Sequence, residues 1–205
     1  MSSLAKVREA LLRHRPTVLD AAPQHRAEVA IVLRDNAGPL DLLLIERAVR
    51  DGDPLSGHMA FPGGRVCGVD TAPRAAAERE TLEEVGLSLA GSESLGRLDD
   101  LHGYQDATRQ LVISAFIFHI VDPNPLTLNY EVKEAFWFPL DALLDSQRYV
   151  EHRIEHGSRT HAPGILVGEP GRHVVWGLTY RFLEDFLKIL GHPLPQRWRA
   201  PSSST

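Results

Sequence analysis

Residues 78–87 read ERETLEEVGL, and they place four glutamates within seven positions. Residues three and four apart share one face of a helix, so the carboxylates of Glu80, Glu83 and Glu84 should converge. Like charges at these spacings destabilise a helix, and a cation among them removes that cost. Oxygen ligands without nitrogen or sulfur are typical of sites for hard divalent cations. The stretch therefore indicates a metal-binding helix, with the alternative of a solvated acidic face in which Glu83 or Glu84 pairs with Arg79.

The residues on either side fit this helix. Residues 74–87 are made largely of strong helix formers, and Gly86 can end the helix in the left-handed conformation. Leu82, Val85 and Ala75 fall on the side opposite the three carboxylates. We expect that side to pack against a sheet.

Apolar and β-branched runs predict strands elsewhere in the chain. The expected strands cover 27–35, 40–48, a short stretch ending at residues 62–64, then 94–101, 109–121 and 129–140. Further helices are expected near the N-terminus, at 140–147 and at 174–190, with loops at 49–58 and 102–108; residues 151–173 show no clear pattern. This order predicts one domain that is either mixed α+β or layered α/β/α. Its parts are an N-terminal helix and connection (1–26), the main domain (27–190) and a tail (191–205).

Composition narrows the class of protein. The chain has 205 residues, is 43% hydrophobic and carries a formal net charge of -5, which suits one globular core and does not favour nucleic-acid binding. Its single cysteine, Cys67, cannot form an internal disulfide, which suits a reducing compartment. No apolar run approaches the roughly 18 residues of a membrane span, and no signal peptide is evident. We expect a cytoplasmic protein with no membrane or nucleic-acid partner, and leave a homodimer open.

A longer stretch of sequence resembles the Nudix box. The matching residues are Gly63-Gly64, Arg79-Glu80, Glu83-Glu84 and Gly86-Leu87. Asp70 stands where the box usually has Glu, Thr81 where it has an apolar residue, and the stretch before the helix is one residue longer. The resemblance implies the Nudix fold, an α+β domain built as an α/β/α sandwich with a mixed sheet, and hydrolysis of a diphosphate linked to a further moiety.

The resemblance also implies roles for the box residues. Glu80, Glu83 and Glu84 would bind Mg²⁺, or Mn²⁺ in its place, while Arg79 orients and neutralises the cluster. A divalent cation between carboxylates and a diphosphate turns their repulsion into attraction and lowers the pKa of bound water. Gly63 and Gly64 allow a turn beside the substrate that a Cβ would obstruct.

The segment before the box is similar to the coenzyme A pyrophosphatase branch of this family. Arg47, Gly57 and Phe61-Pro62-Gly63-Gly64 match its signature, and residues 176–179 match its C-terminal Trp-Gly-Leu-Thr. The branch cleaves coenzyme A to 3′,5′-ADP and 4′-phosphopantetheine. Two alternatives stay open: a pyrophosphatase for ADP-ribose or a nucleotide sugar, and a catalytically silent Nudix domain that binds a nucleotide or a partner protein.

Three residues outside the box helix complete the candidate site. Glu131 lies where the branch has a Glu-Val pair before its last core strand, and is a candidate water activator or additional metal contact. Its alternatives are Glu80 as the base and an ordinary glutamate at a strand entry. Arg47 and Arg65 can bind phosphate oxygens, although either can equally be a surface cation.

Overall fold

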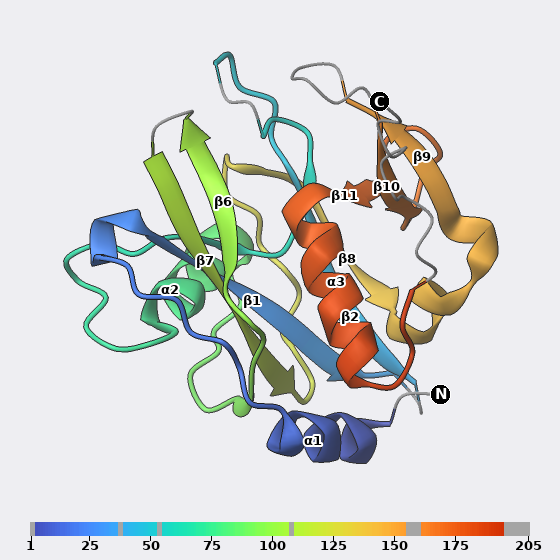
Figure 1. Cartoon of the computed structure of the whole chain (residues 1–205), viewed down its shortest axis with the longest axis horizontal. Helices are drawn as coiled ribbons and strands as arrows, with labels where there is room; N and C mark the ends of the chain where they lie inside the picture. Colours follow the sequence, from blue (N-terminus) through green and yellow to red (C-terminus); the bar gives the residue numbers. More distant parts are fainter. Residues whose placement is uncertain (1–2, 37–38, 53–54, 107–108, 155–160, 195–205) are drawn as a thin grey trace, which may run out of the picture.

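A computed structural model of the chain describes residues 3–36, 39–52, 55–106, 109–154 and 161–194 (Figure 1). Its main sheet is mixed and is centred on β1 (Arg26–Asp35). On one side of β1 runs the parallel strand β7 (Arg109–Ile120), which pairs in turn with β5 (Glu93–Arg97) and β6 (Leu101–Asp106). On the other side the antiparallel strand β2 (Leu40–Arg47) pairs with β3 (Met59–Ala60) and β8 (Val132–Pro139). The short β4 (Gly63–Arg65) pairs with the start of β1.

Helices cover both faces of this sheet because β1 is apolar on both sides. Ile31 and Leu33 contact one core cluster, which includes buried residues of α1 (Leu4–Arg13) and α3 (Gly177–Ile189). Ala30 and Val32 contact a second cluster, which includes buried residues of α2 (Ala75–Val85). The predicted α/β/α sandwich with a mixed sheet is confirmed, and Figure 1 shows α3 crossing in front of the central strands.

A separate small sheet lies in and around residues 151–173, where the sequence showed no pattern, and its last strand takes the first residues of the predicted C-terminal helix. It is antiparallel, and it consists of β9 (Tyr149–Arg153), β10 (His161–Leu166) and β11 (Val174–Trp176). Three short 3-10 helices complete the described elements: η1 (Pro23–His25), η2 (Leu140–Leu144) and η3 (Ser146–Arg148).

Most of the predicted elements are present, and three predictions were wrong in part. Residues 101–106 form β6 instead of a loop, because the long neighbour β7 supplies their backbone partners. The C-terminal helix begins at residue 177, after the strand β11, and residues 140–147 form two 3-10 helices. Residues 195–205 of the predicted tail lie outside the described residues. No described helix is both long and apolar enough to cross a membrane.

Candidate active site

Helix α2 is fixed at both ends by residues that the fold brings to it. Its N-cap residue, Arg74, has a left-handed backbone (φ 71°) and provides no side-chain cap. The carboxylate of Glu28, on β1, does this instead and accepts a hydrogen bond from the Ala76 N–H at 3.1 Å. At the other end Gly86 adopts the left-handed conformation (φ 69°), as predicted, and donates to the Leu82 carbonyl. The helix is thereby tied to the central strand.

The buried side of α2 differs from the prediction. Val85 is fully buried and Ala75 is partly buried, but Leu82 is 51% exposed, so its predicted packing against the sheet was wrong. The position is taken by Thr81, which is fully buried and donates its hydroxyl proton to the Ala77 carbonyl at 2.6 Å. Glu84 lies on the same buried side and is only 2% exposed. The helix has turned one of its carboxylates inward.

The double glycine lets β4 pass between β1 and this helix. Gly63 has a φ of 150°, and a Cβ there would lie 2.6 Å from the Val29 Cα. Its N–H donates to Oε2 of Glu84 at 2.9 Å. A Cβ on Gly64 would overlap the side chain of Glu80. Both glycines are therefore needed to bring the backbone against the two carboxylates.

Arg79 holds the exposed part of the carboxylate cluster. Its guanidinium binds both oxygens of Asp70, with Nε to Oδ1 at 3.1 Å and Nη2 to Oδ2 at 3.0 Å. Through Nη1 it also contacts Glu80 at 2.9 Å and Glu83 at 3.3 Å. The hydrogen bonds from Arg79 lower the pKa of Asp70 to about 2, and Asp70 in turn raises the pKa of Arg79. Asp70, the departure from the usual box, therefore anchors the arginine that spans two predicted metal ligands.

Glu84 lies among the other charged groups of the site. Burial raises the pKa of Glu84 to about 7, opposed by the hydrogen bond from the Gly63 N–H. The charges of Glu80 and Glu131 raise this pKa further, while that of Arg47 lowers it. A buried carboxylate on which two further carboxylates act is poised to bind a cation, and an all-oxygen donor set fits a hard divalent ion. The donor types therefore fit the metal that the box helix implies, although the oxygens of Glu80, Glu83 and Glu84 do not all lie within 4.8 Å of one another in this structure.

Two more of the predicted residues lie near enough to Glu84 for their charges to shift its pKa, Glu131 upward and Arg47 downward. Glu131 precedes β8, and its segment is joined to the end of α2 by a hydrogen bond of 3.0 Å from the Asn129 N–H to the Glu84 carbonyl. Arg47 ends β2 and donates its N–H to the His58 carbonyl. Arg65 is exposed, and its carbonyl accepts from Arg79 at 3.2 Å. The backbone of Arg65 therefore belongs to the network, while phosphate binding by its side chain stays a prediction.

Three contributions were not foreseen from the sequence. Glu28 caps α2, Asp70 binds Arg79 through both oxygens, and Arg50 forms an ion pair of 3.0 Å with Glu131. Each joins segments that are apart in the chain, so no local spacing indicated it. Asp70 alone carried a signal, its place in the box. Glu78, the fourth glutamate of the opening stretch, pairs with Arg74 at 2.8 Å.

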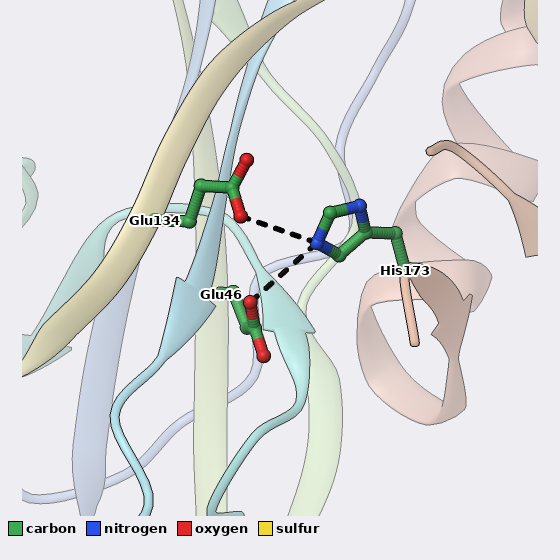
Figure 2. A group of neighbouring side chains, drawn as sticks. All are labelled: Glu46, Glu134 and His173. Carbon is green, nitrogen blue, oxygen red and sulfur yellow. Dashed lines mark ion pairs between the residues drawn. The ribbon is translucent and has the colours of Figure 1, made fainter. Parts of the chain in front are cut away.

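A second cluster of ionisable side chains lies outside the box. Glu46 on β2, Glu134 on β8 and His173 before β11 point toward one another (Figure 2). His173 Nε2 lies 3.5 Å from Glu46 and 3.4 Å from Glu134. Within the described ranges, this is the group of three metal-type ligands whose atoms lie within 4.8 Å of one another.

Its hydrogen bonds mark this cluster as an ion-pair network and not a metal centre. His173 Nδ1 accepts from the Glu169 N–H at 3.0 Å, so a neutral imidazole carries its proton on Nε2 and has no lone pair there for a metal. Arg172 Nη2 lies 2.5 Å from both Glu46 and Glu134. Burial opposes ionisation of Glu46, but hydrogen bonds from Arg172 and Lys133 outweigh it and lower the pKa of Glu46. The network fastens the small sheet to β2 and β8.

Comparisons with known proteins agree with this geometry. The model of the family described as NUDIX domain matches residues 24–156. Human mitochondrial coenzyme A diphosphatase NUDT8 is 32% identical over 166 residues, which cover 80% of this chain and 69% of NUDT8. An uncharacterized Nudix hydrolase, NudL, of Escherichia coli is 29% identical over 86% of this chain and 89% of its own length.

The chain is also similar to a longer relative and to two solved structures. An uncharacterized protein of Schizosaccharomyces pombe, C14C4.10c, is 35% identical over 65% of this chain, which spans 47% of that relative. A MutT/nudix family protein from Enterococcus faecalis has a TM-score of 0.55 at 20% identity, covering 93% of this chain and 70% of its own. The Nudix hydrolase RenU of M. smegmatis has a TM-score of 0.50 at 22% identity, covering 60% and 74%. These two structures support the fold alone.

Proposed function

Because the chain belongs to the NUDIX family of pyrophosphohydrolases, we propose that it hydrolyses the diphosphate bond of coenzyme A or one of its derivatives. The products would be 3′,5′-ADP and 4′-phosphopantetheine. The similarity to a coenzyme A diphosphatase supports this choice of substrate, as does the signature formed by Arg47, Gly57 and residues 61–64. Residues 27–190 would form the hydrolase domain.

One observation carries the proposal: Glu84 is buried beside the carboxylates of Glu80 and Glu131. Without a cation this arrangement costs free energy, because burial and like charges both oppose ionisation. A domain that only bound a partner protein would gain nothing from such a cost.

Glu80, Glu83 and Glu84 would hold the divalent cation, Mg²⁺ or Mn²⁺. When bound, the cation neutralises diphosphate charge and makes a bound water more acidic. Arg79 keeps Glu80 and Glu83 in place through its ion pairs, while Asp70 fixes Arg79.

The remaining residues would handle the substrate and the proton. Arg47 and Arg65 would bind oxygens of the diphosphate. Glu131 would accept a proton from the attacking water, with Glu80 as the alternative base. The water oxygen forms a bond to one phosphorus, the bridging P–O bond breaks, and the second phosphate leaves with the bridging oxygen.

A panel of diphosphates tests the proposal directly. The wild-type chain, Glu83→Gln and Glu84→Gln are assayed with Mg²⁺ on coenzyme A, ADP-ribose and a nucleotide sugar. Coenzyme A should be turned over, and each substitution should reduce kcat/KM at least ~100-fold, since even partners of metal ligands contribute ~10- to 100-fold. Glu78→Gln is the matched control on the same helix, and should retain activity.

Each contrary result has a distinct meaning. Turnover of ADP-ribose but not coenzyme A would overturn the substrate assignment. No turnover of any diphosphate would favour the silent domain. Full activity in both Glu83→Gln and Glu84→Gln would refute the metal role of the helix.

A further inference from the structure

Arg50 lies in the loop that follows β2, and its backbone is fixed there. Its N–H donates to the hydroxyl of Ser56 at 2.9 Å, and the same hydroxyl donates to the Arg50 carbonyl at 2.8 Å. Two residues earlier, the Ala48 N–H donates to the Glu131 carbonyl at 2.8 Å. These bonds hold Arg50 beside Glu131 and thus beside the carboxylates of α2.

The guanidinium of Arg50 makes one ion pair and has an unused donor. Nη1 donates to Oε1 of Glu131 at 3.0 Å. The Cζ atom lies 4.7 Å from the ring centroid of Tyr130, so an aromatic face supports the planar group. Nη2 is buried and has no hydrogen-bond partner in the described part of the chain. A buried N–H without an acceptor is energetically unfavourable, so an acceptor that reaches this atom is favoured.

The surroundings of Arg50 define which acceptor fits. The Glu131 N–H donates to the side-chain oxygen of Asn129 at 2.8 Å, and the Asn129 N–H donates to the Glu84 carbonyl at 3.0 Å, so the Arg50–Glu131 pair lies beside the proposed diphosphate site. The Arg50 side chain as a whole is 38% exposed, so a substrate can approach its guanidinium from solvent. A planar fork of donors matches the oxygens of a phosphate group. An anionic phosphoryl oxygen is therefore the acceptor with the right charge and geometry.

We propose that Arg50 binds a phosphoryl oxygen of the substrate through Nη2 while Nη1 keeps Glu131 oriented. This inference rests on the proposed function, because it assigns a further substrate contact to the same site. Phosphate binding and the orientation of Glu131 are then coupled, since the same guanidinium contacts the diphosphate and the candidate base.

The chain offers a closely matched control for this residue. Arg34 pairs with Asp41 at 3.0 Å, and its Cζ lies 4.4 Å from the ring centroid of Trp137. Arg34 thus has the same two kinds of partner as Arg50. Asp41 and Arg47 are near opposite ends of β2, roughly 20 Å apart for a strand of this length.

The test compares wild type, Arg50→Gln, Arg50→Lys and Arg34→Gln in the full chain. Binding of inorganic pyrophosphate with Mg²⁺ is measured by calorimetry, and kcat and KM are measured on coenzyme A. A hydrogen bond between charged groups is lost in Arg50→Gln, so its Kd for pyrophosphate should rise ~10- to 100-fold. Arg50→Lys keeps the charge but not the fork and should recover part of the affinity, while Arg34→Gln should match wild type.

The outcomes separate this inference from the proposed function. If Arg50→Gln binds pyrophosphate as tightly as Arg34→Gln, or if wild type does not bind it, the inference is overturned whatever happens to coenzyme A. If wild type turns over no diphosphate but its pyrophosphate affinity still depends on Arg50, the proposed function fails and the inference stands. Should Arg50→Gln not fold, Arg50→Lys decides alone, because unchanged Kd and unchanged KM in that variant would refute a role for the fork.

Discussion

Replacing Asp70 by Asn should show how strongly the anchor of Arg79 stabilises the fold. The Asp70 side chain is 3% exposed and is bound through both oxygens by Arg79. The pKa of Asp70 falls from 3.8 to about 2, chiefly because of these hydrogen bonds. At about 1.36 kcal/mol per pKa unit, this shift corresponds to ~2 kcal/mol of stability at neutral pH. Asp70→Asn should therefore lower the free energy of unfolding by ~2 kcal/mol at pH 7.

The sign of the pH dependence follows from the lowered pKa. When the pKa of a carboxyl is lower in the folded state than in the unfolded state, its ionised form stabilises the fold at pH values above the unfolded pKa. This stabilisation is lost as the pH falls through the folded pKa. For Asp70 the window runs from 3.8 down to about 2. Roughly half of the effect should remain at pH 3, and the full effect at pH 5.

The free energy of unfolding is measured by urea titration in metal-free buffer at pH 7, 5 and 3, with tryptophan fluorescence as the signal. Asp20→Asn, a change at an exposed carboxylate, is the control and should alter stability by less than ~0.5 kcal/mol. A difference below ~0.5 kcal/mol between wild type and Asp70→Asn at pH 7 would refute the reasoning. A loss of stability in Asp70→Asn that is equally large at pH 7 and pH 3 would also refute it.

Three further substitutions test the local structure. Gly64→Ala should displace the movable Glu80 side chain and weaken Mn²⁺ binding ~10-fold at little cost in stability. Gly63→Ala brings a Cβ against the β1 backbone and should lower the free energy of unfolding in urea by more than ~3 kcal/mol. Equal stability of the two variants would contradict this difference. Glu28→Ala removes the cap of α2 and should cost ~1–2 kcal/mol, while Glu28→Gln, which keeps an acceptor, should cost less. Burial raises the folded pKa of Glu84 from 4.5 to about 7, so its charge costs stability as the pH rises through that range. In the absence of metal, Glu84→Gln should therefore stabilise the chain by ~3 kcal/mol at pH 8 and by less than ~1 kcal/mol at pH 5. Stability that is unchanged at pH 8 would show that Glu84 is not ionised against burial.

The parts of the fold that sequence could predict are those with strong local patterns. The apolar runs of β1, β2 and β7 and the helix formers of α2 needed no tertiary information. The strand β6 could not be predicted, since its sequence, LHGYQD, is mostly polar and its pairing depends on β7. The small sheet of β9, β10 and β11 likewise consists of short strands with few apolar residues in a row.

The sequence could indicate which residues are candidates for the site, but not which of their side chains are buried and which exposed. Spacing placed Glu80, Glu83 and Glu84 on one side of α2, but could not show that Glu84 turns inward to the Gly63 N–H. Helical periodicity also assigned Leu82 to the core, where Thr81 lies. These details depend on where β4 passes the helix, which is a property of the whole fold.

The central claim is that the carboxylates of α2, and not those around His173, bind a divalent cation. Calorimetric titration of Mn²⁺ into wild type, Glu84→Gln and Glu134→Gln tests it most directly, with a denaturation curve for each variant to confirm folding. Wild type and Glu134→Gln should bind Mn²⁺ with similar affinity, and Glu84→Gln should bind it at least ~10-fold more weakly. Equal affinity in wild type and Glu84→Gln, with loss of binding in Glu134→Gln, would contradict the claim and move the metal to the second cluster.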